Sequence, residues 1–112
     1  MAKAFKKPVI WRGNSFENLK KFSDLAKQSA GFQLDLVQEG EEPLDWKPMP
    51  TIGAGVREIR IWAEKGYRVI YIAKFIEAIY VLHAFEKKTQ KTSKLDLELA
   101  QKRYRELINE RD

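Results

Sequence analysis

The chain of 112 residues contains no cysteine and a single histidine. Without cysteine it can form no disulfide, thiolate nucleophile or cysteine zinc site, and a lone histidine excludes the usual histidine-rich metal cages. Any chemistry therefore comes from Arg, Lys, Glu, Asp or Tyr side chains or from His83. We expect no metal and no other cofactor.

Long apolar runs are also missing. No stretch approaches the roughly 18 to 20 apolar residues that a membrane-spanning helix requires. The N-terminal sequence MAKAFKKPVIW lacks the long apolar centre of a signal peptide. We therefore expect a cytoplasmic protein with no membrane partner, and the length predicts a single domain over residues 1–112.

Acidic residues are scarce where strands are expected. Residues 55–92 carry eight Lys or Arg against four Asp or Glu, whereas residues 14–44 carry three against six. The net charge of +5 is therefore unevenly spread. An excess of cations on one part of a fold is typical of proteins that bind a polyanion such as a nucleic acid.

Residues 55–92 predict three consecutive strands and a basic loop. Runs of β-branched and aromatic residues fill 68–73 and 78–85, and Lys65-Gly66 and residues 74–77 supply the breaks between strands. This spacing is typical of an antiparallel meander. Basic residues are threaded through it and gather at its end: Arg57, Arg60, Arg68, Lys74, Lys87, Lys88 and Lys91.

Side-chain alternation assigns these residues to faces of the predicted sheet. Glu58, Arg60 and Trp62 point one way and Arg57 the other, because successive side chains of a strand alternate. In the last strand the alternation predicts one face shared by five residues: Ile79, Val81, His83, Phe85 and Lys87.

The N-terminal third predicts a short strand and helical structure. Residues 7–12 form an apolar run that begins near a proline, as a first strand tolerates. A helix is expected over residues 15–29, with Asn14-Ser15 at its N-cap. The pattern of residues 32–38 fits both a strand and a helix that ends at Gly40.

Residues 39–55 predict a loop, because three prolines and three glycines interrupt them. Trp46 and Met49 are expected to cap the core, while Lys47 is a candidate phosphate contact. Ser93 and Asp96 predict the cap of a C-terminal helix. The whole order predicts an α+β domain with helices gathered against one side of an antiparallel sheet.

Cleavage of RNA fits the available side chains. RNA supplies its own nucleophile, the 2′-hydroxyl, so a protein needs only to align it, move protons and stabilise negative charge on phosphorus. Arg60, Arg68 and Lys87 are the candidates for charge stabilisation. The loop that contains Lys88 and Lys91 offers further phosphate contacts.

Structural roles compete with these assignments. Glu58 and Arg60 have the spacing of a same-face ion pair, and Arg68 has the surroundings of a structural arginine paired with Glu58. His83 lies among apolar residues, where a packed histidine is more common than a catalyst, although its ordinary pKa of about 6.5 suits proton transfer.

Several motifs resemble, in the same order, the phage-derived branch of the RelE/HigB toxins over residues 8–108. The most specific are Glu58-Ile59-Arg60, Tyr67-Arg68-Val69-Ile70-Tyr71 and Phe85-Glu86-Lys87-Lys88-Thr89-Gln90-Lys91-Thr92. The resemblance implies a RelE-like domain with two N-terminal helices packed on an antiparallel sheet and a C-terminal helix, which would make residues 32–38 helical.

The resemblance also implies an activity and partners. The RelE/HigB toxins belong to type II toxin–antitoxin systems and cut messenger RNA on the ribosome without a metal. Each is silenced by an antitoxin, often a helix-turn-helix protein like HigA. A translation-inhibiting mRNA interferase is the expected function. The alternatives are a ParE-like toxin that binds DNA gyrase and a phage-derived nucleic-acid-binding module without activity.

The resemblance implies roles for individual residues as well. Arg68 matches the strand arginine expected to contact the scissile phosphate, and Arg60 and Lys87 fall where the family keeps further basic groups. Glu58 and His83 are carried over as the candidates for proton transfer. The expected RNA contacts are Lys47, Arg57, Lys74, Lys88 and Lys91.

Overall fold

The computed structural model describes residues 6–111 as a sheet with helices on both faces. Five strands and three helices lie in this part of the chain, which confirms the predicted α+β class. In chain order they are β1 (Val9–Trp11), α1 (Ser15–Lys20), α2 (Asp24–Gln38), β2 (Trp46–Pro48), β3 (Val56–Ala63), β4 (Lys65–Ile72), β5 (Ile79–Lys87) and α3 (Lys94–Arg111).

The sheet has the strand order β1-β5-β4-β3-β2. The predicted meander is present as β3, β4 and β5, which pair antiparallel as consecutive strands. The prediction of a wholly antiparallel sheet is wrong, because β1 pairs parallel with β5. A parallel neighbour requires a long crossover, and most of the chain separates these two strands.

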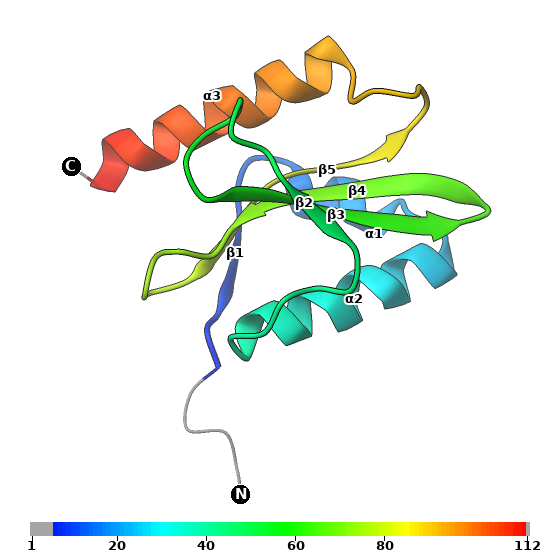
Figure 1. The fold of residues 1–112 in the computed structure, drawn as a ribbon, viewed down its shortest axis with the longest axis horizontal. Coiled ribbons are helices and arrows are strands. Elements are labelled where there is room, and N and C mark those ends of the chain that lie inside the picture. The colour runs from blue at the N-terminus through cyan, green and yellow to red at the C-terminus, as the bar shows by residue number, and fades with distance from the viewer. Residues whose placement is uncertain (1–5, 112) are drawn as a thin grey trace, which may run out of the picture.

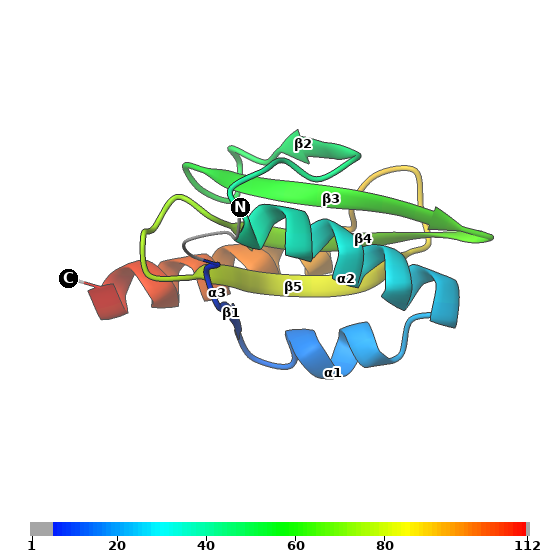
Figure 2. The ribbon, with the colours of Figure 1, turned by 90° about the horizontal axis from the view of Figure 1, so that it is seen from below.

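The helices cover both faces of the sheet, and the prediction that they gather on one side is wrong. Figure 1 shows the sheet nearly edge-on, with α3 above it and α2 below, and Figure 2 shows α1 beside α2. Leu19, Ala26 and Leu34 of the N-terminal helices pack on one side, and Ala100 and Leu107 of α3 pack on the other. Both faces of β4 are apolar, so a helix is needed on each.

The N-terminal helical region breaks at a different place from the predicted one. The expected helix over residues 15–29 is interrupted after Lys20, and α2 then continues through Gly31 to Gln38. The Ser23 hydroxyl caps α2 by accepting a hydrogen bond from the Ala26 amide at 3.2 Å. Asn14 occupies the N-cap position of α1, as predicted, but its side chain makes no capping hydrogen bond. Residues 32–38 are helical, as the resemblance implied.

The segment over residues 39–55 contains a strand that was predicted as loop. Trp46–Pro48 forms β2, an edge strand paired antiparallel with β3. Met49 is buried in the core beneath α3, as expected, whereas Trp46 is half-buried and stacks with Arg57, whose guanidinium carbon lies 4.0 Å from the ring centroid.

A β-bulge in β5 changes which residues share a face. Ile70 pairs with His83 while Tyr71 pairs with Val81, which leaves Leu82 as the extra residue. Ile79 and Val81 therefore pack against the N-terminal helices, and Leu82 and Phe85 pack on the α3 side. The predicted face shared by residues 79, 81, 83, 85 and 87 is wrong for this reason.

α3 begins at Lys94, as its capping residues predicted. The Ser93 hydroxyl accepts a hydrogen bond from the Asp96 amide at 3.1 Å. Further along α3 the buried Arg103 donates to the carbonyl of the bulged Leu82 at 3.0 Å and to Asn14 Oδ1 at 2.6 Å. Arg103 thus fastens α3 to β5 and to the loop before α1.

Within residues 6–111, no helix is long and apolar enough to cross a membrane. The same residues contain no cluster of three or more histidine or acidic side chains that could hold a metal ion.

Candidate functional site

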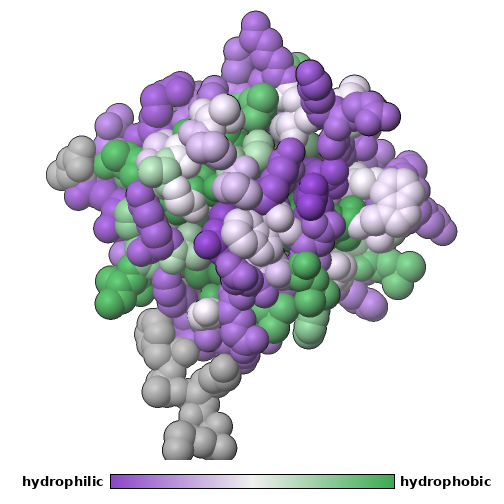
Figure 3. Space-filling model, viewed as in Figure 1, coloured by the Kyte–Doolittle hydropathy of each residue, from purple (hydrophilic) through white to green (hydrophobic). Residues whose placement is uncertain are grey.

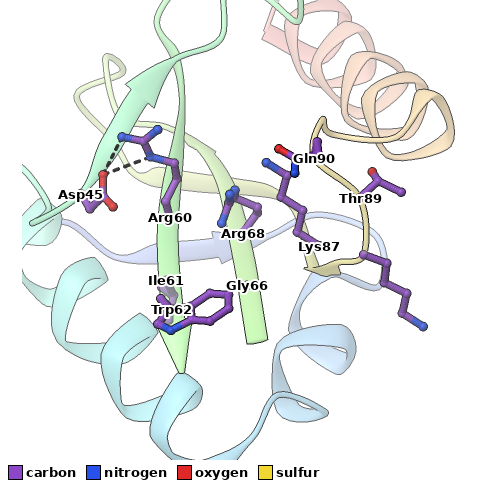
Figure 4. Close-up of a pocket in the computed structure, with 10 residues that line it drawn as sticks. Asp45, Arg60, Ile61, Trp62, Gly66, Arg68, Lys87, Thr89 and Gln90 are labelled. Atoms are coloured by element: carbon purple, nitrogen blue, oxygen red, sulfur yellow. Dashed lines mark hydrogen bonds and ion pairs between the residues drawn. The ribbon is translucent and has the colours of Figure 1, made fainter. Parts of the chain in front are cut away.

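A basic cleft opens on the α3 side of the sheet, at the end that α3 leaves uncovered. We use "basic cleft" for the cavity of about 810 Å³ lined by Asp45, Arg60, Ile61, Trp62, Gly66, Arg68, Lys87, Lys88, Thr89 and Gln90. Figure 4 shows Arg60, Arg68 and Lys87 extending into it from neighbouring strands. The cleft thus brings together the three side chains predicted to stabilise a phosphate.

Strand register explains this convergence. Arg60 of β3 lies opposite Arg68 of β4, and Lys87 of β5 lies opposite Gly66, two residues before Arg68. Directly paired residues of neighbouring strands project on the same face. α3 covers the apolar residues of this face, including Ile70 and Ile72, but does not extend over the arginines.

Arg60 is held by a carboxylate at the rim of the cleft. Its Nε and Nη2 donate to Asp45 Oδ1 at 3.0 and 2.7 Å, and its backbone amide donates to the Asp45 carbonyl at 2.8 Å. The predicted alternative of a Glu58–Arg60 ion pair is not formed. Asp45 instead fixes the direction of the Arg60 side chain, because a fork of two donors restricts the guanidinium plane.

Arg68 lies over a fully buried carboxylate. Glu58 Oε1 is 3.4 Å from Arg68 Nε, and Glu58 Oε2 accepts a hydrogen bond from the Thr92 hydroxyl at 3.1 Å. Arg68 Nη1 donates to the Tyr67 carbonyl at 3.0 Å. The Arg68–Glu58 ion pair, expected as the structural role of Arg68, is therefore present. Arg68 nevertheless also lines the cleft.

Burial lowers the pKa of Arg68 below its ordinary value, and Glu58 partly counteracts this effect. Arginine nevertheless stays charged, since its ordinary pKa lies far above neutral pH. Lys87 is affected in the same direction: burial and then the charge of Arg68 lower the pKa of its ammonium group. A lysine with a lowered pKa gives up its proton more readily.

His83 lies outside the basic cleft. Its Nε2 is 2.7 Å from Asp96 Oδ1, and its ring stacks on Phe85 with a centroid separation of 4.9 Å. Burial lowers the pKa of His83, although its hydrogen bond to the Asp96 carboxylate opposes the shift. The buried Nδ1 of His83 has no hydrogen-bond partner, and a ring that donates from Nε2 alone would leave no proton on it.

The predicted RNA contacts divide into two groups. Lys88 lines the basic cleft, and Lys47 and Lys91 line a neighbouring pocket that shares Gln90 with it. Arg57 and Lys74 instead line a pocket with Tyr71 on the side of the sheet that α2 covers. The structure therefore does not bring Arg57 and Lys74 to the cleft.

Asp45 and Trp62 line the cleft but were not among the predicted site residues. Asp45 was not predicted as a site residue, because the pairing of β2 with β3 that places it beside Arg60 joins residues far apart in the sequence. Trp62 was assigned to the correct face by alternation, but its exposure was not expected: 79% of the residue is accessible to solvent. A tryptophan on the same face as two strand arginines was the available signal.

The surroundings of the cleft are strongly polar. Hydrophilic side chains cover most of the side of the molecule shown in Figure 3, and apolar side chains form small separate patches. Four cations line the cleft against one acidic residue, which is already paired with Arg60. Such a charge balance suits an anion, and two guanidinium groups match the oxygens of a phosphate in particular.

The family model for proteins described as "phage derived protein Gp49-like" (DUF891) matches residues 17–105. The chain belongs to this Gp49-like family. The matched segment contains every residue that lines the basic cleft. The family description agrees with the phage-derived origin that the resemblance implied, and it names no activity. No curated protein matches the chain at a significant level.

Proposed function

We propose that this Gp49-like protein is the toxin of a type II toxin–antitoxin system and a RelE/HigB-like endoribonuclease that cuts messenger RNA on the ribosome. The observation that carries the proposal is the convergence of Arg60, Arg68 and Lys87 in one open cleft. The phage-derived family and the order of strands β3 to β5 support it.

The proposed reaction uses side chains of the protein, the RNA itself and solvent water. The 2′-hydroxyl gives its proton to a solvent water as its oxygen attacks the neighbouring phosphorus. The bond from phosphorus to the 5′-oxygen of the next nucleotide breaks, which leaves a 2′,3′-cyclic phosphate. Arg68 and Arg60 stabilise the additional negative charge on the phosphate oxygens. Lys87, with its lowered pKa, donates a proton to the departing 5′-oxygen.

The two predicted proton-transfer groups are less well placed. Glu58 is fully buried beneath Arg68, and His83 is paired with Asp96 outside the cleft. Their catalytic roles stay predictions, and the geometry favours a positioning role for Glu58. In this proposal Glu58 holds the Arg68 guanidinium at the floor of the cleft, where it faces the phosphate.

Partners follow from the same proposal. The ribosome would present the messenger RNA in a single-stranded form, and the cations around the cleft would hold its backbone. Lys47, Lys88 and Lys91 are the RNA contacts on this side of the sheet. A neighbouring antitoxin of the helix-turn-helix, HigA-like kind would silence the toxin.

The test is primer extension on a translated message in a purified cell-free system, with and without ribosomes. We compare the wild type with Arg68→Ala and use Arg57→Ala as the matched control, because Arg57 lies on the other side of the sheet. Loss of Arg68 should reduce cleavage by roughly 100- to 1000-fold, as for other pre-placed donors to a developing charge. Arg57→Ala should cut like the wild type.

Two outcomes would contradict the proposal. An intact message together with cleaved gyrase–DNA complexes would indicate a ParE-like toxin. RNA binding that weakens with salt but yields no product ends would indicate a non-catalytic module. Thermal unfolding of each variant establishes that a lost activity does not reflect a lost fold.

A further inference from the structure

Trp62 is an aromatic side chain that the fold leaves outside the core. It lies near the tip of the β3–β4 hairpin, and 79% of it is exposed although it lines the basic cleft. The other large apolar residues with more than two thirds exposure, Leu44, Ile76 and Leu95, do not line this cleft. Trp62 is therefore set apart by its cationic neighbours, not by its exposure alone.

Gly66 has no side chain to fill the space between Trp62 and Arg68. A Cβ added to Gly66 would lie 3.9 Å from Trp62 Cε3 and 3.7 Å from Arg68 Nη1. Figure 4 shows the indole ring beside Gly66, with Arg68 next to it. A flat aromatic surface and a guanidinium group thus border the same small volume, which no side chain of Gly66 fills.

From this arrangement we infer that Trp62 is a stacking site for one nucleobase of single-stranded RNA, next to the phosphate that Arg68 contacts. The inference rests on the proposed function, because it takes the anion in the cleft to be an RNA phosphate. The base lies against the indole ring, and the backbone runs over Gly66 toward Arg68 and Lys87. The site positions the strand for cleavage.

The charge around Trp62 favours a nucleobase over a protein side chain. Exposed aromatic residues at protein interfaces are typically surrounded by apolar contacts that exclude water. Trp62 instead shares its cleft with Arg60, Arg68, Lys87 and Lys88. Aromatic rings interleaved with cations are the pattern of single-strand binding grooves, where stacking accepts any base. The site therefore selects for unpaired bases and not for a particular one.

Binding of a 5′-fluorescein-labelled 2′-O-methyl oligouridine of twelve nucleotides tests the inference by fluorescence anisotropy. This RNA cannot be cut, because it lacks the 2′-hydroxyl nucleophile, so binding is measured without chemistry. Trp62→Ala should weaken binding by about 5- to 150-fold, the range of one base–aromatic stack. Trp62→Phe should retain most of the affinity, and Ile76→Ala is the control for loss of an exposed apolar side chain far from the cleft.

A backbone without bases separates stacking from charge. Inorganic polyphosphate should bind Trp62→Ala as tightly as the wild type, and the salt dependence of RNA binding should keep the wild-type slope, because no phosphate contact is lost. Arg68→Ala should instead weaken the binding of both probes. An equal loss of polyphosphate and RNA binding in Trp62→Ala would overturn the inference, as would unchanged RNA binding.

The failure of the inference and the failure of the proposed function give different results. If Trp62→Ala binds RNA normally while ribosome-dependent cleavage still requires Arg68, the nuclease stands and the stacking site is wrong. If Trp62→Ala loses RNA binding while no message is cut by the wild type, the stacking site stands without the nuclease. Loss of antitoxin binding alone in Trp62→Ala would show that the indole contacts a protein.

Discussion

Glu58 shows how one buried side chain organises the cleft. Its carboxylate has no exposed surface and lies between the Arg68 guanidinium and the Thr92 hydroxyl. Arg68 has only 13% of its side chain exposed, so its charge is also largely removed from water. Each charge of such a pair makes the burial of the other tolerable, and removal of one partner is costly.

We therefore expect Glu58→Gln to reduce both stability and cleavage. The amide can still accept the hydrogen bond from Thr92, but Arg68 loses its counter-charge, which should cost on the order of 3 kcal/mol in free energy of unfolding. Urea unfolding measures this loss. Thr92→Val is the control: it removes one hydrogen bond, should cost about 1 kcal/mol, and leaves Arg68 paired. Wild-type stability with abolished cleavage would instead indicate that Glu58 transfers a proton.

His83 predicts a pH dependence of stability. Burial lowers its pKa in the folded state, whereas the unfolded chain keeps the ordinary value of about 6.5. The unfolded state therefore binds more protons just below pH 6.5, and stability falls as the pH drops through the range between the two pKa values. The neighbours that bear on this shift are Asp96, which opposes it, and Arg103, which adds to it.

The comparison variant is His83→Gln, which keeps a donor for Asp96 and has no titration in this range. The free energy of unfolding is measured for the wild type and for the variant at pH 7.5, 6.5 and 5.5. The difference, wild type minus variant, should become smaller as the pH decreases. The subtraction removes the shared contribution of the carboxylates. An advantage that grows at low pH would mean that protonated His83 is stabilised by its ion pair with Asp96.

Among the elements, α3 depends on a contact that the β5 bulge creates. The bulge makes Leu82 an extra residue between two paired ones, and Arg103 of α3 donates a hydrogen bond to the Leu82 carbonyl. Arg103 passes directly beneath Gly13, where an added Cβ would lie 2.5 Å from Arg103 Nε. Gly13 also has a φ of +54°, a conformation that other residues adopt only with strain.

Two glycine substitutions test this arrangement with opposite signs. Gly13→Ala should lower the free energy of unfolding by about 2 kcal/mol or more, through backbone strain and the collision with Arg103. Gly31→Ala, in the middle of α2 with nothing within 4 Å of the added Cβ, should raise it by about 0.5 to 1 kcal/mol. Thermal and urea unfolding measure both. Equal changes in the free energy of unfolding of the two variants would show that the position of Gly13 does not require a glycine.

Periodicity predicted the elements whose signals are local. The meander was predicted because β-branched and aromatic residues run between turn residues, and α3 because Ser93 and Asp96 mark its start. The bulge at Leu82 was not predictable, since it is a property of the pairing of two strands. The placement of helices on both faces and the parallel pairing of β1 likewise depend on long-range contacts.

The same limit applies to the cleft. Arg60, Arg68 and Lys87 were predicted together because each carries a charge on the correct strand of a meander, and the register confirms that they meet. Asp45 could not be paired with Arg60 from the sequence, because β2 was predicted as a loop. Arg57 was included among the RNA contacts although alternation had already assigned it to the opposite face.

At the scale of the whole molecule, the sheet separates two sets of cations. Lys88 belongs to the basic cleft, whereas Lys74 lines the pocket that Arg57 and Tyr71 also line, and both lysines are exposed. The two lysines contribute equally to the net charge of +5. If RNA were attracted only by the net charge, Lys88 and Lys74 would contribute equally to RNA binding. If RNA binds at a defined face, their contributions should differ.

We expect Lys88→Ala and Lys74→Ala to differ in the salt dependence of RNA binding. Loss of a phosphate contact at Lys88 should weaken binding and reduce the slope of log K against log salt by about 0.7, the value for a single strand. Lys74→Ala should leave the slope unchanged. Anisotropy titrations with the 2′-O-methyl oligouridine at several salt concentrations measure both slopes. Equal reductions in the two variants would mean that the RNA wraps around the molecule, and the cleft would then be one part of a larger surface.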